Sequence, residues 1–223
     1  MARKPVIAID GPAGAGKSTI ARLVAERLGF RYIETGAMYR AAAYKARQLG
    51  IPPDNAERLG ALSADLDLRF EPRPDGTHIV LDCQDITDAL RDPRIGELAS
   101  QISLLAQVRE PLVAQQRQMA EAGGAVLEGR DTQTVVCPDA EVKIFLTASP
   151  EERARRRLEQ LQQEGRPADF DSVLREVRER DARDQERALS PLRPAPDAVI
   201  LNTDGMAVSE VVEEILKHVG ADS

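Results

Sequence analysis

The sequence predicts an α/β fold in which a five-stranded parallel sheet is covered by helices on both faces. Short apolar runs alternate along the chain with segments whose apolar residues recur at helical spacing, the order that parallel strand–helix–strand units require. The runs are nearly continuous, as in strands buried on both faces. Because ligands of such sheets gather beyond the carboxyl ends of the strands, a site is expected there.

The N-terminal part of the chain begins with a strand at residues 5–10 and a helix at 17–28, which Gly29 ends. A second strand is expected at residues 30–33, and Glu34, Thr35 and Gly36 are interpreted as a short polar turn. Two further helices are expected, at residues 37–49 and 55–64.

Residues 66–70 and 78–82 form two short, partly alternating runs joined by a Pro-Arg-Pro-Asp-Gly segment. This pattern predicts an antiparallel hairpin. Because it interrupts the alternation of strands and helices, we expect a small inserted lobe at about residues 66–83.

The C-terminal part of the chain supplies the other three strands of the sheet. Ser149, Pro150 and Glu152 form a strong helix start, and Gly165-Arg166-Pro167 separates two charged helices that we interpret as an exposed helical lid. We expect strands at residues 125–127, 142–146 and 198–201, and helices at 91–103, 108–122, 149–163, 171–189 and 209–218.

Composition indicates a globular chain of 223 residues, which we expect to form a single domain and a monomer. Its parts would be a core (1–34, 123–148 and 195–223), a lobe at 35–122 and a lid with the following helix at 149–194. A net charge of −7 and 3% aromatic residues argue against a nucleic-acid partner. Two cysteines, no leader pattern at Met1-Ala2-Arg3 and no long apolar segment predict a cytoplasmic protein without a membrane partner.

Residues 11–19, between the first strand and the first helix, form a glycine-rich loop that matches the P-loop pattern. In a P-loop, backbone N–H groups surround phosphate oxygens at a helix N-terminus. Lys17 would reach the β- and γ-phosphates of ATP, and the Ser18 hydroxyl would bind Mg²⁺. An ordinary glycine-rich turn is the alternative, but chance rarely produces all four fixed positions directly after a strand. The expected nucleotide-binding residues are Gly11, Pro12, Ala13, Gly14, Ala15, Gly16, Lys17, Ser18 and Thr19.

Glu128 follows an apolar strand and is interpreted as a second Mg²⁺ ligand, with an ordinary strand-end carboxylate as the alternative. Arg180, Arg183, Asp184 and Arg187 have the spacing of one helical face. A salt-bridged exposed helix is the alternative for this set. The preceding helix carries Arg153, Arg156 and Arg157, of which the last two are expected at the transferring phosphoryl group, as catalytic residues with Lys17. The run 155–157 is otherwise a solvated or weak nucleic-acid-binding patch.

Four further motifs make the chain resemble the bacterial cytidylate kinases, P-loop kinases that transfer the γ-phosphate of ATP to CMP or dCMP. They are Thr35-Gly36-Ala37-Met38-Tyr39-Arg40, Gln107-Val108-Arg109-Glu110, Glu128-Gly129-Arg130-Asp131 and the segment 179–187. The resemblance covers nearly the whole chain and includes the hairpin insert. Three positions depart from the family pattern, with Thr35 for serine, Gln133 for glycine and Cys137 for an aromatic residue.

The resemblance implies roles for acceptor-side residues. Ser100, Arg109 and Asp131 would read the cytosine edge, a role that suits an arginine donor and a carboxylate acceptor. Taken alone, Arg109 and Asp131 would each be interpreted as solvated surface charges, and only the joint pattern favours the role in base reading. Ligands of the monophosphate would be Arg40, Arg130 and Arg187; Asp184 would hold the ribose, Thr35 would support the lobe, and Arg180 would join the substrate-binding face.

Two other functions stay open from the sequence. A kinase of another small acceptor, such as UMP, a sugar acid or shikimate, would keep the loop and the lid. A P-loop module that hydrolyses or senses ATP would need no acceptor.

Overall fold

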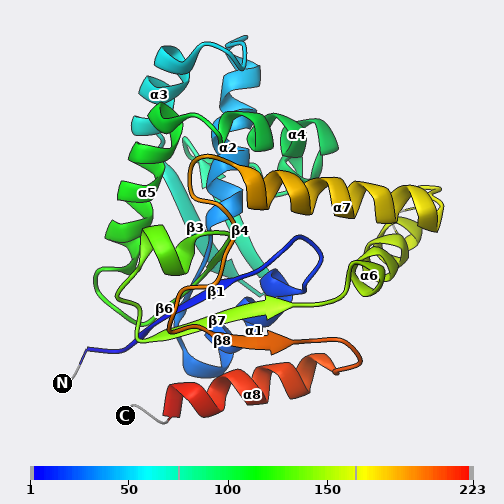
Figure 1. The fold of residues 1–223 in the computed structure, drawn as a ribbon. Helices are drawn as coiled ribbons and strands as arrows, with labels where there is room; N and C mark the ends of the chain where they lie inside the picture. Colours follow the sequence, from blue (N-terminus) through cyan, green and yellow to red (C-terminus); the bar gives the residue numbers. More distant parts are fainter. Residues whose placement is uncertain (1–2, 75, 164, 221–223) are drawn as a thin grey trace. The chain divides into compact units, whose positions relative to one another are not determined.

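The computed structural model describes residues 3–74, 76–163 and 165–220, which form two compact units (Figure 1). The first unit comprises Met1–Arg31 and Gly123–Ser223, and the second comprises Tyr32–Ala122. Met1 and Ala2, at the N-terminus where no leader pattern was found in the sequence, and Asp75 of the predicted hairpin turn lie outside the described residues. No helix in the described part of the chain is long and apolar enough to cross a membrane.

The sheet of the first unit confirms the predicted α/β fold. Its strand order is β2-β6-β1-β7-β8, and β1 lies in the centre with parallel neighbours on both sides. Every residue of β1 and β6 is buried, whereas the last strand in the order, β8, alternates between half-buried and exposed residues. The strands are β1 (Val6–Asp10), β2 (Arg31–Glu34, where the chain passes into the second unit), β6 (Ala125–Gly129), β7 (Val142–Thr147) and β8 (Val199–Asn202).

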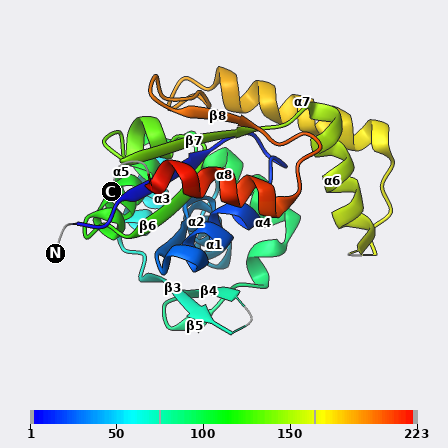
Figure 2. The same ribbon diagram turned by 90° about the horizontal axis from the view of Figure 1, so that it is seen from below.

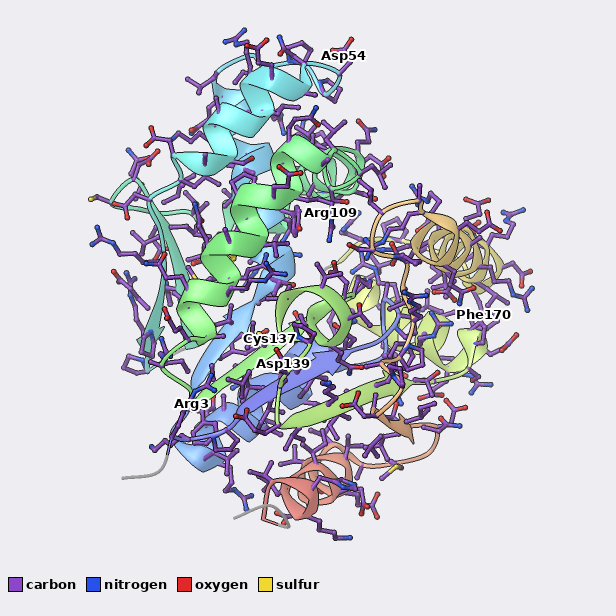
Figure 3. The ribbon with its side chains drawn as sticks, turned by 60° about the vertical axis from the view of Figure 1, so that its left-hand side comes forward. Arg3, Asp54, Arg109, Cys137, Asp139 and Phe170 are labelled. Atoms are coloured by element: carbon purple, nitrogen blue, oxygen red, sulfur yellow. The ribbon has the colours of Figure 1, made fainter. Side chains whose placement is uncertain are left out.

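Helices α1 (Lys17–Leu28) and α8 (Val208–Gly220) pack side by side against the sheet, as Figure 2 shows from below. An ion pair of 3.0 Å between Arg27 and Glu213 joins them at the surface. A π-helical turn, η2 (Thr132–Val136), follows β6 and was not predicted. Figure 3 labels Cys137 and Asp139 in the segment that leads from this turn to β7.

Helices α6 (Pro150–Gln163) and α7 (Phe170–Glu186) form the predicted helical hairpin. The Ser149 hydroxyl accepts a hydrogen bond from the N–H of Glu152 at 3.2 Å, which confirms the predicted N-cap. The hairpin has a small core of its own, formed by Ala154, Leu161, Val173 and Val177 with partly buried Leu158, Phe170 and Leu174. Phe170 is labelled at the start of α7 in Figure 3.

The second unit is built on α2 (Thr35–Gln48), whose five buried alanines allow neighbouring elements to approach closely. Thr35 is the first residue of this helix, so the predicted polar turn at residues 34–36 is wrong. The hairpin is present, and a third strand that was not predicted extends it. The unit's other elements are α3 (Ala56–Ala64), β3 (Leu68–Arg73), β4 (Gly76–Leu81), β5 (Gln84–Asp85), η1 (Ala89–Arg91), α4 (Pro93–Ile102) and α5 (Ala106–Ala120).

Both cysteines are free thiols, with Cys83 exposed and Cys137 half-buried. Cys83 and Asp82 occupy the turn between β4 and β5, and both have positive φ angles, 64° and 49°. Met38 is completely buried in the core of the second unit, as expected for a packing residue.

Candidate active site

The P-loop connects β1 to α1 and lies against the ends of other elements of the first unit. A Cβ atom at Gly11 would lie 2.0 Å from the carbonyl oxygen of Leu146 in β7, so only glycine fits this close approach. Gly14 has a φ of 79° and packs against the Cβ of Arg153, which a Cβ on Gly14 would approach to 3.1 Å. Gly11 and Gly14 are therefore favoured by packing as well as by the turn.

Lys17 lies buried inside this loop, where its Nζ donates a 2.8 Å hydrogen bond to the carbonyl oxygen of Pro12. Burial, together with the positive charge of Arg130, lowers the pKa of Lys17 to about 7. The adjacent Ser18 hydroxyl donates to Oε1 of Glu128 at 3.0 Å, so the hydroxyl and carboxylate predicted to hold Mg²⁺ lie together.

Arg130 and Asp131, the two residues directly after β6, each form an ion pair within the first unit. Nε of Arg130 lies 2.9 Å from Oδ2 of Asp184, and Nη2 of Arg187 lies 3.9 Å from Oδ1 of Asp131. Both members of the second pair are buried, so the alternative of solvated charge is excluded for Asp131. Burial alone would raise the pKa of Asp184, but the charge of Arg130 holds that pKa below its ordinary value.

Arg180 and Arg183 lie on the last turns of α7 with Asp184, as predicted. The predicted single helical face from 180 to 187 is wrong at its end, because α7 stops at Glu186. Arg187 has an extended backbone (φ −60°, ψ 136°), and its Nε donates to the carbonyl oxygen of Ser190. Its side chain reaches Asp131 from the loop that follows the helix.

The arginines of α6 have three different environments. Arg153 is buried and forms a two-fold ion pair with Asp181 of α7, with N–O distances of 2.8 and 2.6 Å. Arg156 donates to Glu152 and to both the hydroxyl and the carbonyl oxygen of Thr203. Arg157 donates to Gln160 on its own helix. Of the two predicted catalytic arginines, Arg156 therefore contacts the segment after β8, and Arg157 has a local contact within α6.

The other predicted acceptor-side residues belong to the second unit. Arg109, near the start of α5 (Figure 3), is 6% exposed and lies 5.7 Å from the ring centre of Tyr39, so it is not a solvated surface charge. It also donates to the carbonyl oxygen of Ser103 at 3.4 Å. Arg40 forms an ion pair with Glu34. Thr35 is buried and Ser100 is half-buried on α4.

Two buried polar side chains of the first unit have contacts that were not predicted from the sequence. Asp10, directly before the P-loop, accepts hydrogen bonds from Thr132 and Gln133, and Arg153, predicted only to lie on the lid helix, links the P-loop to α7. The position of Asp10 at the end of a fully apolar strand is a sequence signal that could have indicated its role, since a buried charge needs partners.

Comparison with known proteins identifies the family. The model of the cytidylate kinase family matches residues 7–221 of the chain. A cytidylate kinase of Symbiobacterium thermophilum is 47% identical over 217 residues, which cover 97% of this chain and 96% of that protein.

Two other similarities differ in extent. A bifunctional pantoate ligase/cytidylate kinase of Synechococcus sp. (strain JA-3-3Ab) is 48% identical, and the match covers 96% of this chain but only 40% of that longer protein. An uncharacterised protein from Eubacterium ventriosum has a similar structure, with a TM-score of 0.54, 13% identity and coverage of 98% and 99% of the two chains, which shows a shared fold alone. The extent of the family match and the near-full-length identity show that this chain belongs to the cytidylate kinase family.

Proposed function

We propose that this protein transfers the γ-phosphate of ATP to CMP or dCMP, giving ADP and CDP or dCDP. Its relatives are named cytidylate kinases, which supports the choice of acceptor. The observation that carries the proposal is the charged cluster in the first unit, where the Arg130–Asp184 and Asp131–Arg187 pairs accompany the buried lysine of the P-loop.

The residues of the loop fit a nucleotide with a divalent cation. Mg²⁺ prefers oxygen ligands and is usually held by one or two carboxylates together with substrate phosphates. The hydrogen-bonded Ser18 hydroxyl and Glu128 carboxylate supply such oxygens, and we assign them to Mg²⁺. The bound cation would neutralise charge on the phosphate oxygens. Lys17 and the backbone N–H groups of residues 11 and 13–19 would bind the phosphates of ATP, and Pro12, which has no N–H, would contribute only to the shape of the loop.

On the acceptor side, we assign Arg130 and Arg187 to the monophosphate, Asp184 to the ribose and Asp131 to the cytosine amine. Each of these arginines is paired with one of these carboxylates in the structure, so the side chains are held in place before a ligand arrives. From the second unit we assign Arg40 to the monophosphate, and Ser100 and Arg109 to the base. Thr35 is assigned to support of the acceptor lobe. Arg180 completes the set on α7.

The chain's residues would accelerate the transfer by position and charge rather than by a dedicated base. Phosphoryl transfer passes through a loose, in-line transition state whose charge lies on the transferring oxygens. Lys17, Arg156 and Arg157 would stabilise that charge. Nη1 of Arg156 donates to Thr203 and already lies beside the P-loop, 3.9 Å from the position that a Cβ atom on Gly16 would take. Arg157 contacts Gln160 on its own helix and would have to leave this partner. Closure of residues 149–194 would bring Arg157 inward and exclude water, which otherwise competes with CMP.

We also propose that the protein acts as a monomeric, cytoplasmic enzyme with one kinase domain, comprising the predicted core, acceptor lobe and lid. The α6–α7 hairpin has a small apolar core of its own, which supports its assignment as a distinct lid. Two free thiols agree with a reducing compartment.

The experiment that tests the function is a panel of acceptors with ATP and Mg²⁺, followed by ADP formation. We expect CMP and dCMP to give the highest kcat/KM, with UMP and shikimate far lower. Steady ATP hydrolysis that does not change when CMP is added would instead support the acceptor-free module. A higher kcat/KM for UMP or shikimate would support the other rival, a kinase of a different acceptor.

A further inference from the structure

The segment that carries Arg130 and Asp131 is attached to the strand that leads into the P-loop. Oδ1 of Asp10 accepts hydrogen bonds from the Thr132 N–H at 3.0 Å and the Thr132 hydroxyl at 2.8 Å. Oδ2 of Asp10 accepts from the Gln133 N–H at 2.8 Å. Asp10, Thr132 and Gln133 are each at most 1% exposed, so water cannot replace these bonds.

The side chain of Gln133 adds a second contact to β1 and extends this attachment to two other segments. Its Nε2 donates to the carbonyl oxygen of Ala8 in β1 at 3.3 Å and to that of Ile144 in β7 at 2.6 Å. Its Oε1 accepts from the N–H of Ala195, beyond α7, at 3.3 Å. One buried amide therefore joins the two central strands to the segment that returns from the helical hairpin.

That returning segment carries the partner of Asp131. Arg187 begins it and donates to the carbonyl oxygen of Ser190, while the N–H of Leu192 donates to the carbonyl oxygen of Asp184 at 2.8 Å. The segment ends at Ala195, whose N–H donates to the side-chain oxygen of Gln133. The amide of Gln133 thus joins the segment of Asp131 to the segment of Arg187, and the side chains of these two residues lie 3.9 Å apart.

We propose that Gln133 is a positioning residue for the acceptor side of the reaction, and that it holds Asp131 and Arg187 in register through its buried amide. The inference rests on the proposed function, because it assigns both charged side chains to CMP. None of the hydrogen bonds of Gln133 described above reaches Lys17 or Ser18, so its loss should weaken CMP binding more than ATP binding.

The test compares Gln133→Met, which keeps a long side chain but removes the amide, with the wild-type protein. We expect the KM for CMP and the CMP dissociation constant from calorimetry to rise about tenfold, the factor that one or two lost hydrogen bonds give. The KM for ATP should change by less than about twofold. Ile215→Val, a fully buried change in α8, is the matched control that lowers Tm and should leave both KM values unchanged.

Gln133→Gly provides a second variant if the methionine protein does not fold, since glycine is the residue that the family pattern has here. Unchanged CMP binding in a folded Gln133 variant would show that the amide serves stability alone and would overturn the inference. Equal rises in the KM for ATP and for CMP would do the same. If wild-type protein does not phosphorylate CMP, the proposed function fails instead, and the two failures are therefore distinguishable.

Discussion

Replacing Arg153 by methionine should destabilise the protein far more than an ordinary surface change, because all three guanidinium nitrogens are used. Nε donates to the carbonyl oxygen of Ala148, Nη1 to that of Ala13 in the P-loop, and Nη1 and Nη2 pair with Asp181. The arginine side chain is 4% exposed and the aspartate side chain 16%. Removing one partner of such a buried pair leaves an uncompensated charge and costs about 3–5 kcal/mol of unfolding free energy.

The assay is urea unfolding of wild type, Arg153→Met, Asp181→Leu and the double variant. The double variant leaves no buried charge behind, so it should recover at least about 2 kcal/mol relative to the sum of the single changes. The matched control is Arg178→Met, because Arg178 joins the same two helices through a 2.8 Å pair with Glu151 whose side chains are 60% and 45% exposed. That change should cost at most about 1 kcal/mol. A cost for Arg153→Met as small as that for Arg178→Met would refute the reasoning.

Three further predictions concern the P-loop, the base-reading carboxylate and the buried acid. Lys17→Ala should keep the fold by circular dichroism but lose about 10²–10³-fold or more in kcat, and near-normal turnover would contradict its role. Asp131→Ala should lower kcat/KM for CMP about ten- to a hundred-fold and for UMP much less; an equal loss for both would make Asp131 structural. Burial raises the pKa of Asp10 from 3.8 to about 6. Between these two pH values the Asp10 carboxyl is therefore protonated in the folded state and ionised in the unfolded state. The unfolding free energy of wild type relative to Asp10→Asn should therefore fall by up to about 3 kcal/mol from pH 4 to pH 7, and a constant difference would contradict this.

The sheet could be predicted from the sequence because its strands are nearly all apolar and its helices have clear starts and stops. The P-loop fixed the position of the central strand, and Ser149 marked the start of α6 through its side-chain cap. The third strand of the small sheet was missed because the turn before it uses Asp82 and Cys83 at positive φ, where asparagine and glycine are the usual residues.

The candidate site could be predicted in its residue types but not in its pairings. Helical spacing put Arg187 on the same face as Arg180, yet the helix ends at Glu186 and tertiary contacts to Ser190 and Asp131 decide its direction. Arg153 has the same residue type and helix as Arg156, and tertiary contacts to Gly14 and Asp181 distinguish the buried arginine from the half-buried one. The contacts of Gln133 join segments far apart in the chain, which no local pattern reports.

Transfer of the γ-phosphoryl group from ATP to CMP can be followed directly with ATP labelled in its γ-phosphate. Wild-type protein is incubated with Mg²⁺, CMP and the labelled ATP, and the products are then separated. We expect the label to appear in CDP and almost none to be released as inorganic phosphate. Label released as inorganic phosphate at the same rate with and without CMP would contradict this expectation.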